Sequence, residues 1–201
     1  RELHQQLHVP VGLIDATWGG TRIESWTPPE GFAAVPALQK ESELVQLGDP
    51  RTTAHQQRLA QTLKDTEQWL VAARQALGKQ QLVPPMPNYP TELLPPHDVQ
   101  NATALYNGMI HPLQPFPLRG AIWYQGESNA GRHDQYTELS KLMIADWRNR
   151  WGQGEFPFLL VQLAAFEPGG DTWPFLREAQ TETLEAPNTG MAVTTDIGDA
   201  K

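Results

Sequence analysis

Residues 126–130, Gly-Glu-Ser-Asn-Ala, place a serine where a hydrolase could carry its nucleophile. An apolar run precedes them and a helical pattern follows, and the pattern G-x-S-x-G/A between a strand and a helix exposes a serine above a sheet. Such a serine needs a histidine as its base. His133 is the one histidine downstream, and it lies only five residues away at the start of the same helix. We therefore interpret Ser128 as a residue that caps this helix or bonds within the loop.

The same loop fits better as a set of hydrogen-bond donors. Gln125 leaves the predicted strand with a neutral amide, which can donate to an oxyanion as negative charge develops on it. Gly126 allows the backbone to come close to a ligand. Gly19 and Gly20 end another apolar run, and their N–H groups would point into the same crevice. A double glycine is more often only a tight turn, so the prediction of a shared oxyanion site depends on the pairing of the two loops.

The six histidines show no spacing typical of a metal site. The pattern H-E-x-x-H is absent, and the acidic residues are spread along the chain, which indicates a solvated surface rather than a metal cage. His111 could reach the crevice, although a structural role is the commoner one for such a residue. We therefore expect no bound metal.

Tryptophan is frequent, with seven residues in 201, and Trp18, Trp26 and Trp123 lie near the two loops in sequence. Their rings could stack on sugar rings, or they could pack in the core. The sequence leaves both interpretations open.

An alternation of strands and helices would position the two loops. We predict strands over residues 9–17, 121–124, 158–163 and 191–195, a helix that ends at Gly152, and a helix over about 174–185. Such an alternation implies an α/β fold with a parallel sheet and right-handed crossovers. In these sheets, sites form where the carboxyl ends of the strands meet the loops.

Residues from about 28 to 98 read as an insertion between core elements. A helical pattern begins at Asp49-Pro50, carries a leucine stripe and ends at Gly78, which gives a helix about 40 Å long. A proline-rich return over residues 82–96 leads to a short helix near 105–110. The first residues, up to Pro10, resemble the end of an amphipathic helix, so we expect both termini to be cut from something longer.

Composition excludes several classes of protein. The chain holds 15 Lys and Arg against 23 Asp and Glu, a formal charge of −8, and lacks the basic surface that nucleic acids or anionic lipids require. The longest apolar runs fall short of the roughly 20 residues of a membrane-spanning helix. The chain has no cysteine, which excludes disulfides and thiol nucleophiles. We expect no nucleic-acid or membrane partner, and the sequence says nothing about oligomeric state.

Four ordered segments carry a resemblance to a known family: W-G-G-T-R-I-E-S-W, L-Y-N-G-M-I-H-P-L, I-W-Y-Q-G-E-S-N-A and D-W-R-N-R-W-G-Q-G-E-F-P-F. Together they resemble the sialate O-acetylesterase-like (SASA) carbohydrate esterases of the SGNH hydrolase superfamily. The resemblance implies a three-layer, flavodoxin-like α/β sandwich. It also implies removal of acetyl groups from sugars through a serine acyl-enzyme, with an acetylated sugar or glycan as the partner and no metal or organic cofactor.

The resemblance also implies which residues form the site. The second conserved block of the family supplies a backbone N–H from a glycine, and it falls on Gly19 and Gly20. The third block reads Q-G-E and falls on Gln125, Gly126 and Glu127, with the glutamine amide completing the oxyanion hole. Family members are commonly exported, so the expected location is the periplasm or the cell exterior.

Two segments of the family pattern do not occur in these 201 residues. The family's nucleophile lies in a G-Q-S-N segment upstream of P-V-G-L-I, and its histidine lies in a D-x-x-H segment downstream of the strand that matches residues 191–195. We therefore expect the chain to be the central part of one esterase domain, with Ser128 belonging to the third block. Two alternatives stay open: a carbohydrate-binding module on an esterase scaffold, and an α/β-hydrolase that uses Ser128.

Overall fold

Three short parallel strands form the sheet. The computed structural model describes residues 2–33, 35–95, 98–114, 116–166 and 170–197. Strands β1 (Ala121–Trp123), β2 (Phe158–Val161) and β3 (Thr189–Ala192) lie side by side in chain order and pair in parallel. The predicted α/β class with a parallel sheet is confirmed. Each strand is shorter than predicted or differs from its predicted bounds by a few residues.

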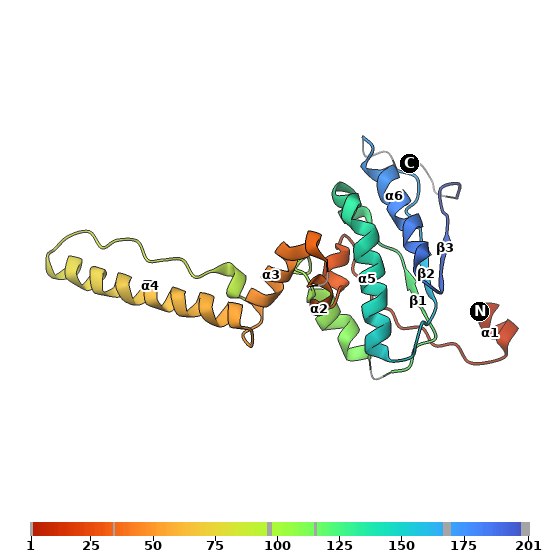
Figure 1. Ribbon diagram of the computed structural model, residues 1–201, viewed down its shortest axis with the longest axis horizontal. Coiled ribbons are helices and arrows are strands. Elements are labelled where there is room, and N and C mark those ends of the chain that lie inside the picture. Colours follow the sequence, from red (N-terminus) through yellow and green to blue (C-terminus); the bar gives the residue numbers. More distant parts are fainter. Residues whose placement is uncertain (1, 34, 96–97, 115, 167–169, 198–201) are drawn as a thin grey trace.

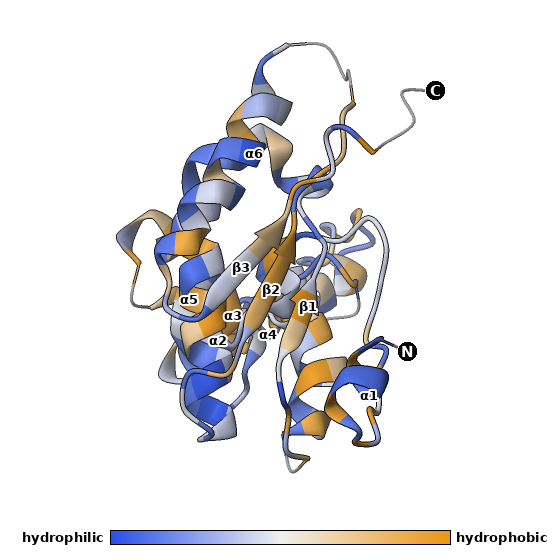
Figure 2. Ribbon diagram, turned by 90° about the vertical axis from the view of Figure 1, so that its right-hand side faces the viewer, coloured by the Kyte–Doolittle hydropathy of each residue, from blue (hydrophilic) through white to orange (hydrophobic). Residues whose placement is uncertain are grey.

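Two helices cover one face of this sheet (Figures 1 and 2). Helix α5 (His133–Trp151) connects β1 to β2, and helix α6 (Thr172–Glu182) connects β2 to β3. Helix α5 ends at Gly152, as predicted, because this glycine adopts the left-handed conformation with φ +62°. Between sheet and helices lies the core, with Leu139, Met143, Trp147, Phe158, Leu160 and Leu176 among its buried side chains.

The other face of the sheet stays open in the described residues. Ile122, Leu159 and Gly190 lie in register across the three strands on that face. The side chain of Ile122 is 73% exposed and that of Leu159 is 47% exposed. The described part of the chain therefore shows the sheet and one of the helical layers that a three-layer sandwich contains.

The predicted strand over residues 9–17 is wrong. Helix α1 (Glu2–Leu7) is followed by an extended segment that joins no sheet, and Leu13 in this segment is 88% exposed. A β-branched run becomes a strand only when a neighbouring strand accepts its backbone hydrogen bonds. Among the described residues, no strand pairs with the outer edge of β1 either. The sequence pattern was that of a strand, but its pairing partner is not among these elements.

A long helical arm projects from the rest of the molecule (Figure 1). Helices α2 (Pro29–Phe32) and α3 (Gln39–Gly48) lead to α4 (Thr53–Gly78), and an extended return ends at a 3-10 turn, η3 (Thr91–Leu93). We call residues 52–90 the arm. Part of the segment expected to be inserted belongs to the core, because Phe32 and Leu38 are fully buried in it.

The arm differs from its prediction in two details. Helix α4 begins three residues later than Pro50, because the Thr52 hydroxyl accepts the His55 N–H at 3.2 Å while Asp49 bonds Arg51 instead. The expected leucine stripe is also not buried: Leu63, Leu70 and Leu77 are 56%, 40% and 73% exposed. The return packs on another side of the helix, where the Trp69 indole N–H donates to the Pro84 carbonyl at 2.8 Å.

The chain then returns to the core through a short helical segment. The predicted short helix near residues 105–110 is a single π-helical turn, η4 (Tyr106–Ile110), and a 3-10 turn, η5 (His111–Leu113), follows it.

Among the described residues, no helix is long and apolar enough to cross a membrane.

Candidate active site

Two loops meet at the carboxyl end of β1. The first, residues 18–27, contains the 3-10 turn η1 (Ile23–Trp26), and the second, residues 125–132, contains the 3-10 turn η6 (Glu127–Arg132). The Gln125 amide donates to the Thr21 carbonyl at 3.0 Å, and the Ile23 N–H donates to the Asn129 amide oxygen at 3.0 Å. These contacts connect residues more than 100 positions apart, so the geometry of each loop depends on the other.

Asn129 joins the two loops from a fully enclosed position. Its side chain is 1% exposed. Its oxygen accepts from the Ile23 backbone and from Gln125 Nε2, the latter at 2.8 Å, and its Nδ2 donates to Glu24 Oε2 at 2.9 Å. Every partner of this amide is itself buried, so the site has one specific arrangement rather than a set of interchangeable ones.

An ion pair between a buried carboxylate and a half-buried guanidinium adjoins Asn129. Glu24 is only 3% exposed, and its other oxygen pairs with the guanidinium of Arg132, which comes from the second loop. Arg132 also lies 3.5 Å from Glu41 on α3. Sequence reasoning missed Glu24, Asn129 and Arg132, because each of these polar residues alone looks like an ordinary solvated one.

Gln125 is held at every polar atom. It is 7% exposed, both hydrogens of its amide have acceptors in Thr21 and Asn129, and its oxygen accepts from the Tyr136 hydroxyl at 2.9 Å. Burial raises the pKa of Tyr136 to about 12. The phenol therefore stays protonated at neutral pH and remains a donor, which fixes the orientation of the Gln125 amide.

The glycine turn of the first loop is held by its carbonyl. Gly20 adopts φ +73°, and its carbonyl accepts from Ser128 Oγ at 2.9 Å and from Gln100 Nε2 at 2.6 Å. Within the described ranges, the N–H groups of Gly19 and Gly20 have no hydrogen-bond acceptor. Both glycines are exposed. The turn therefore presents free backbone donors beside the joined loops.

Gly126 has a packing reason for being glycine. A side-chain carbon there would lie 2.9 Å from Leu176 Cδ2 and 3.1 Å from Gln180 Nε2, both on α6. The Gln180 amide also donates to the Gln125 carbonyl at 3.0 Å. Helix α6 thus packs directly against this loop and bonds its backbone.

The remaining predicted residues form no catalytic group among the described residues. Ser128 donates to the Gly20 carbonyl, and the His133 ring lies 5.0 Å from the ring of Phe175, so among the described residues Ser128 is not paired with a base. The Glu127 side chain is exposed. In the described part of the chain, no group of three or more histidine or acidic residues could hold a metal ion.

The tryptophans divide between core and surface. Trp26 is 3% exposed and packs edge to face on Trp123 at 5.8 Å between ring centroids. Trp123 packs in turn on Trp147. Trp18, next to the glycine turn, is 53% exposed. Only Trp18 among these residues presents a ring to solvent beside the candidate site.

Comparison with known proteins identifies the family. The model of the SASA family, described as carbohydrate esterase, sialic acid-specific acetylesterase, matches residues 96–201, slightly more than half of the chain. The chain belongs to this family. The resemblance given by the four motifs is thereby confirmed.

Individual relatives agree with the family assignment. A sialate O-acetylesterase from Mus musculus is 32% identical over 99% of this chain and 36% of its own length, and one from Homo sapiens is 31% identical over 99% and 32%. A crystal structure of a carbohydrate acetylesterase from Xanthomonas citri superposes with a TM-score of 0.64 at 34% identity, covering 100% of this chain and 34% of that one. The chain thus spans about a third of the length of the relatives it matches.

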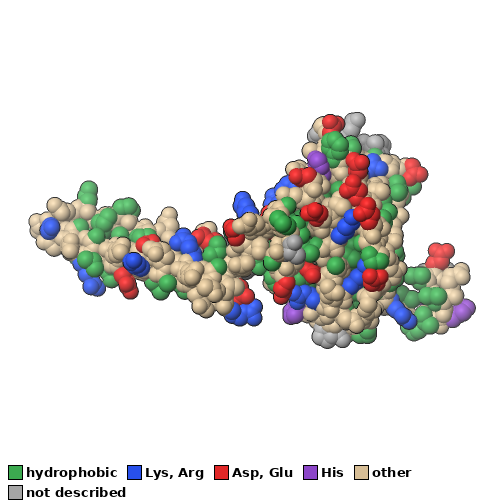
Figure 3. Space-filling model, viewed as in Figure 1, with side chains coloured by type: hydrophobic (Ala, Val, Ile, Leu, Met, Phe, Trp, Pro, Cys, Tyr) green, Lys and Arg blue, Asp and Glu red, His purple; other side chains and the backbone are tan. Residues whose placement is uncertain are grey.

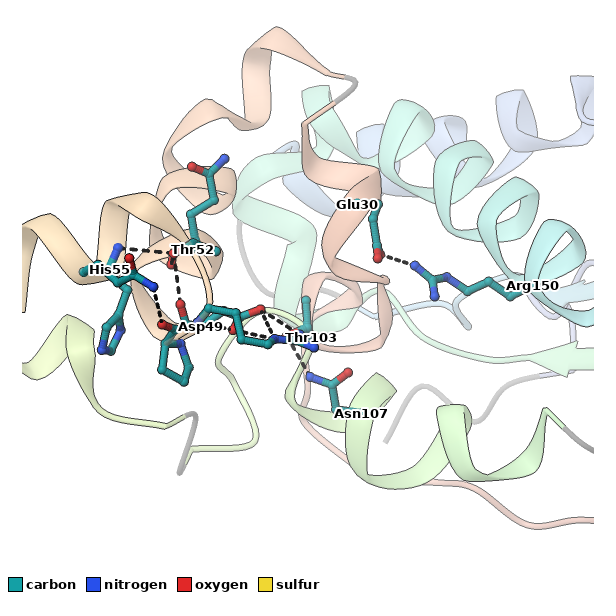
Figure 4. A network of polar contacts seen from close by, with 11 residues as sticks. Glu30, Asp49, Thr52, His55, Thr103, Asn107 and Arg150 are labelled. Atoms are coloured by element: carbon teal, nitrogen blue, oxygen red, sulfur yellow. Dashed lines mark hydrogen bonds and ion pairs between the residues drawn. The ribbon is translucent and has the colours of Figure 1, made fainter.

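This SASA chain also has an open cleft beside the joined loops. Its volume is about 1000 Å³, within the range of small-molecule sites. Its walls come from α3, the corner between α3 and α4, residues within 91–94 and 100–107, and the loop residues Arg22, Glu24 and Arg132. Figure 4 shows the corner with Asp49 and Thr52, and with Thr103 and Asn107 bonded to one another nearby.

Proposed function

We propose that this chain forms the oxyanion-binding part of a carbohydrate O-acetylesterase, which removes acetyl groups from sugar hydroxyls through a serine acyl-enzyme. One observation carries the proposal. At the carboxyl end of a parallel strand, the buried Gln125–Asn129 network holds a glycine turn whose N–H groups have no acceptor in the described residues. The names of the curated relatives and of the similar crystal structure support the same reaction.

In the proposed reaction, a serine oxygen attacks the acetyl carbonyl and its proton passes to a histidine. The tetrahedral oxyanion accepts hydrogen bonds from the backbone N–H groups of Gly19 and Gly20 and from the amide of Gln125. The sugar oxygen leaves with the proton from the histidine, and water then releases acetate from the serine. We propose that the serine and the histidine belong to G-x-S-N and D-x-x-H segments outside these 201 residues.

Gln125 can serve the oxyanion by exchanging one acceptor. Its Nε2 now donates to two neutral oxygens, those of Thr21 and Asn129. A charged oxyanion is a stronger acceptor than a neutral amide or carbonyl oxygen, since charge-assisted hydrogen bonds are roughly twice as strong. The amide is therefore held in place before the reaction and donates when the charge develops. Gly126 and Glu127 complete the loop in this proposal.

The test of the oxyanion role is Gln125→Ala in the full-length protein. We expect kcat to fall about 10²–10³-fold while KM changes little, because the interaction is made mainly in the transition state. Gln135→Ala on α5, where the glutamine is half-buried, is the matched control and should retain activity. A change confined to KM would contradict the role of Gln125.

The nucleophile is tested by covalent labelling with a serine-directed phosphonate. The full-length protein should be labelled at a serine upstream of Arg1, and Ser128→Ala should keep measurable esterase activity, because Ser128 bonds the Gly20 carbonyl. Labelling at Ser128 would favour the α/β-hydrolase alternative. Absence of any labelled serine would favour the carbohydrate-binding module.

We further propose that the arm sets the preference for the leaving sugar, because the α3–α4 corner from which it begins lines the cleft. Replacing residues 52–90 by a Gly/Ser loop should change the ranking of acetylated sugars and leave hydrolysis of a small aryl acetate unchanged. An unchanged ranking, or loss of folding, would contradict this proposal.

A further inference from the structure

A row of leucines on the arm stays open to solvent. Leu63, Leu70 and Leu77 follow one another at intervals of seven residues on α4, and all three are exposed. Figure 3 shows apolar side chains along the surface of the arm. The return of the chain contacts a different side of α4, where the Trp69 indole donates to the Pro84 carbonyl. The leucine row is therefore an apolar surface that the rest of the arm leaves uncovered.

Three further side chains extend this row into the pattern of a coiled coil. Leu59, Thr66 and Ala73 each lie four residues before one of the leucines, and all three are half-buried. Alternating steps of four and three residues keep side chains on one side of a helix and form the contact line of paired helices. Thr66 suits an apolar contact, because its hydroxyl already donates to the Thr62 carbonyl of its own helix at 2.8 Å. We call residues 59, 63, 66, 70, 73 and 77 the seam.

Two opposite charges border the seam on the same side. Glu67 directly follows the seam position 66, and Arg74 directly follows position 73. Both side chains are exposed, and in the described part of the chain neither belongs to an ion pair. The arm therefore carries a positive and a negative charge, seven residues apart, that its own fold does not use.

This charge pattern is complementary to itself in one orientation. When two such helices pair antiparallel, each border of the seam faces the same border of the other helix, so Glu67 of one copy meets Arg74 of the other, twice. In a parallel pair this border faces the opposite one, which carries Thr62, Trp69 and Ala76 and no charge. The two charges thus favour an antiparallel pair of identical helices.

The shape of the molecule agrees with this orientation. The arm projects from a wider body (Figure 1), so parallel arms would bring two bodies to the same end of the pair, whereas antiparallel arms separate them. The two Glu67–Arg74 pairs place the symmetry axis between Leu70 and Val71. Leu70 of one copy then lies opposite the small Ala73 of the other, which lets the two helices interlock. The helices overlap over residues 63–78, a length of about 24 Å.

We propose that the arm is a dimerisation surface, on which the seam of α4 pairs antiparallel with the seam of a second copy of this chain. Removal of the leucines from water drives the association, and the two ion pairs set its orientation. The paired length is short, so the dimer belongs to the class of weak complexes, with a dissociation constant in the micromolar range. The proposal is independent of the esterase reaction, because it uses no residue of the candidate active site.

Sedimentation equilibrium of the full-length protein over a range of concentrations tests the dimer. We expect a reversible equilibrium between monomer and dimer. Leu70→Gln should raise the dissociation constant at least about 10-fold, because each dimer loses two buried leucines. Val71→Gln is the matched control and should leave the dissociation constant unchanged, since Val71 is an exposed neighbour that lies outside the seam.

Exchange of the two charges tests the orientation. Glu67→Arg alone, or Arg74→Glu alone, brings like charges together in an antiparallel dimer and should raise the dissociation constant. The double variant with both substitutions restores two opposite pairs and should return the constant close to that of the wild type. A double variant as weak as the single ones would overturn the antiparallel pairing.

Thermal unfolding distinguishes a second copy from another segment of the same molecule. Leucine and glutamine have similar helix propensities, so Leu70→Gln should leave the Tm of the dilute monomer unchanged if the seam is free there. A lower Tm in the dilute monomer would mean that the same molecule covers the seam, which would overturn the proposal. A protein that is monomeric at every concentration, or a dimer that Leu70→Gln does not weaken, would overturn it as well.

Discussion

The joined loops and the arm are held together in opposite ways. The loops depend on buried side-chain contacts between residues more than 100 positions apart, such as Gln125 with Thr21 and Asn129 with Glu24. The arm depends on its own helix, a cap at Thr52 and the contact of Trp69 with Pro84, and it leaves apolar side chains exposed along its length (Figure 3). The loops therefore form only when the whole fold forms, whereas the arm is determined mainly by local sequence.

Replacing Asn129 should lower the stability of the joined loops by the largest amount. Asn129→Ala leaves a backbone N–H, an amide and a carboxylate oxygen buried without their partner, so we expect a loss of about 3–5 kcal/mol in the free energy of unfolding. Urea denaturation measures it. Asn149→Ala, at an exposed position of α5, is the control. A loss below about 1 kcal/mol would show that the loops do not depend on this amide.

Alkaline pH should have the second-largest effect on the loop network. The folded-state pKa of Tyr136 lies near 12, raised by burial from an ordinary value of 10. Its stabilising contribution is complete below pH 10 and is lost as pH rises toward 12, because the unfolded chain releases the proton first. Between pH 8 and 11.5, the free energy of unfolding should fall by about 2 kcal/mol more in the wild type than in Tyr136→Phe. Urea denaturation at each pH measures both values. Equal losses would contradict the buried phenol.

The cap of α4 should have a smaller and local effect. Thr52→Ala removes the acceptor of the His55 N–H and should destabilise the first turn of the helix by about 1 kcal/mol. Amide hydrogen exchange should speed up at the start of α4 and stay unchanged in β1 and α5. Thr53→Ala, at an exposed neighbouring position, controls for the substitution itself. Faster exchange throughout the core would mean that arm and core unfold together.

The ion pair at the α3–α4 corner should matter least for stability. Hydrogen bonds from Arg51 lower the pKa of Asp49 to about 2. Because its pKa is lowered in the folded state, the ionised Asp49 carboxylate stabilises the fold above about pH 4. This stabilisation is lost as the pH falls through 2. The pair is exposed, so Arg51→Ala should change the free energy of unfolding by less than about 0.5 kcal/mol while the pKa of Asp49 returns toward 3.8. NMR titration of the Asp49 carboxyl measures the shift, and an unchanged pKa would contradict the contact.

Local signals in the sequence predicted much of the fold. The apolar periodicity before Gly152 and the helical pattern up to Gly78 gave α5 and α4 within a few residues, because helices are stabilised by contacts close in sequence. The segment 9–17 failed for the opposite reason. Its pattern was that of a strand, but a strand depends on a neighbour that the segment itself does not specify.

The structure brings the two predicted loops together, but the side chains that hold them were not predicted. Local signals pointed to three residues. A glycine turn indicated Gly19 and Gly20, and a neutral amide at a strand end indicated Gln125. Glu24 and Arg132 could not be found in the same way, because 108 positions separate them and no sequence signal connects the one to the other. Their pairing exists only once α5 and η1 have packed.

In the part of the chain that the structure describes, the outer edge of β1 is unpaired, which has a consequence for handling the protein. An open strand edge offers a row of backbone donors and acceptors to any other extended chain, and here it adjoins the exposed apolar side chain of Ile122. Natural proteins usually protect such edges with charged side chains, proline or a covering segment. In concentrated solution two molecules can add strand to strand at this edge or at the edge of β3, which is also unpaired among the described residues.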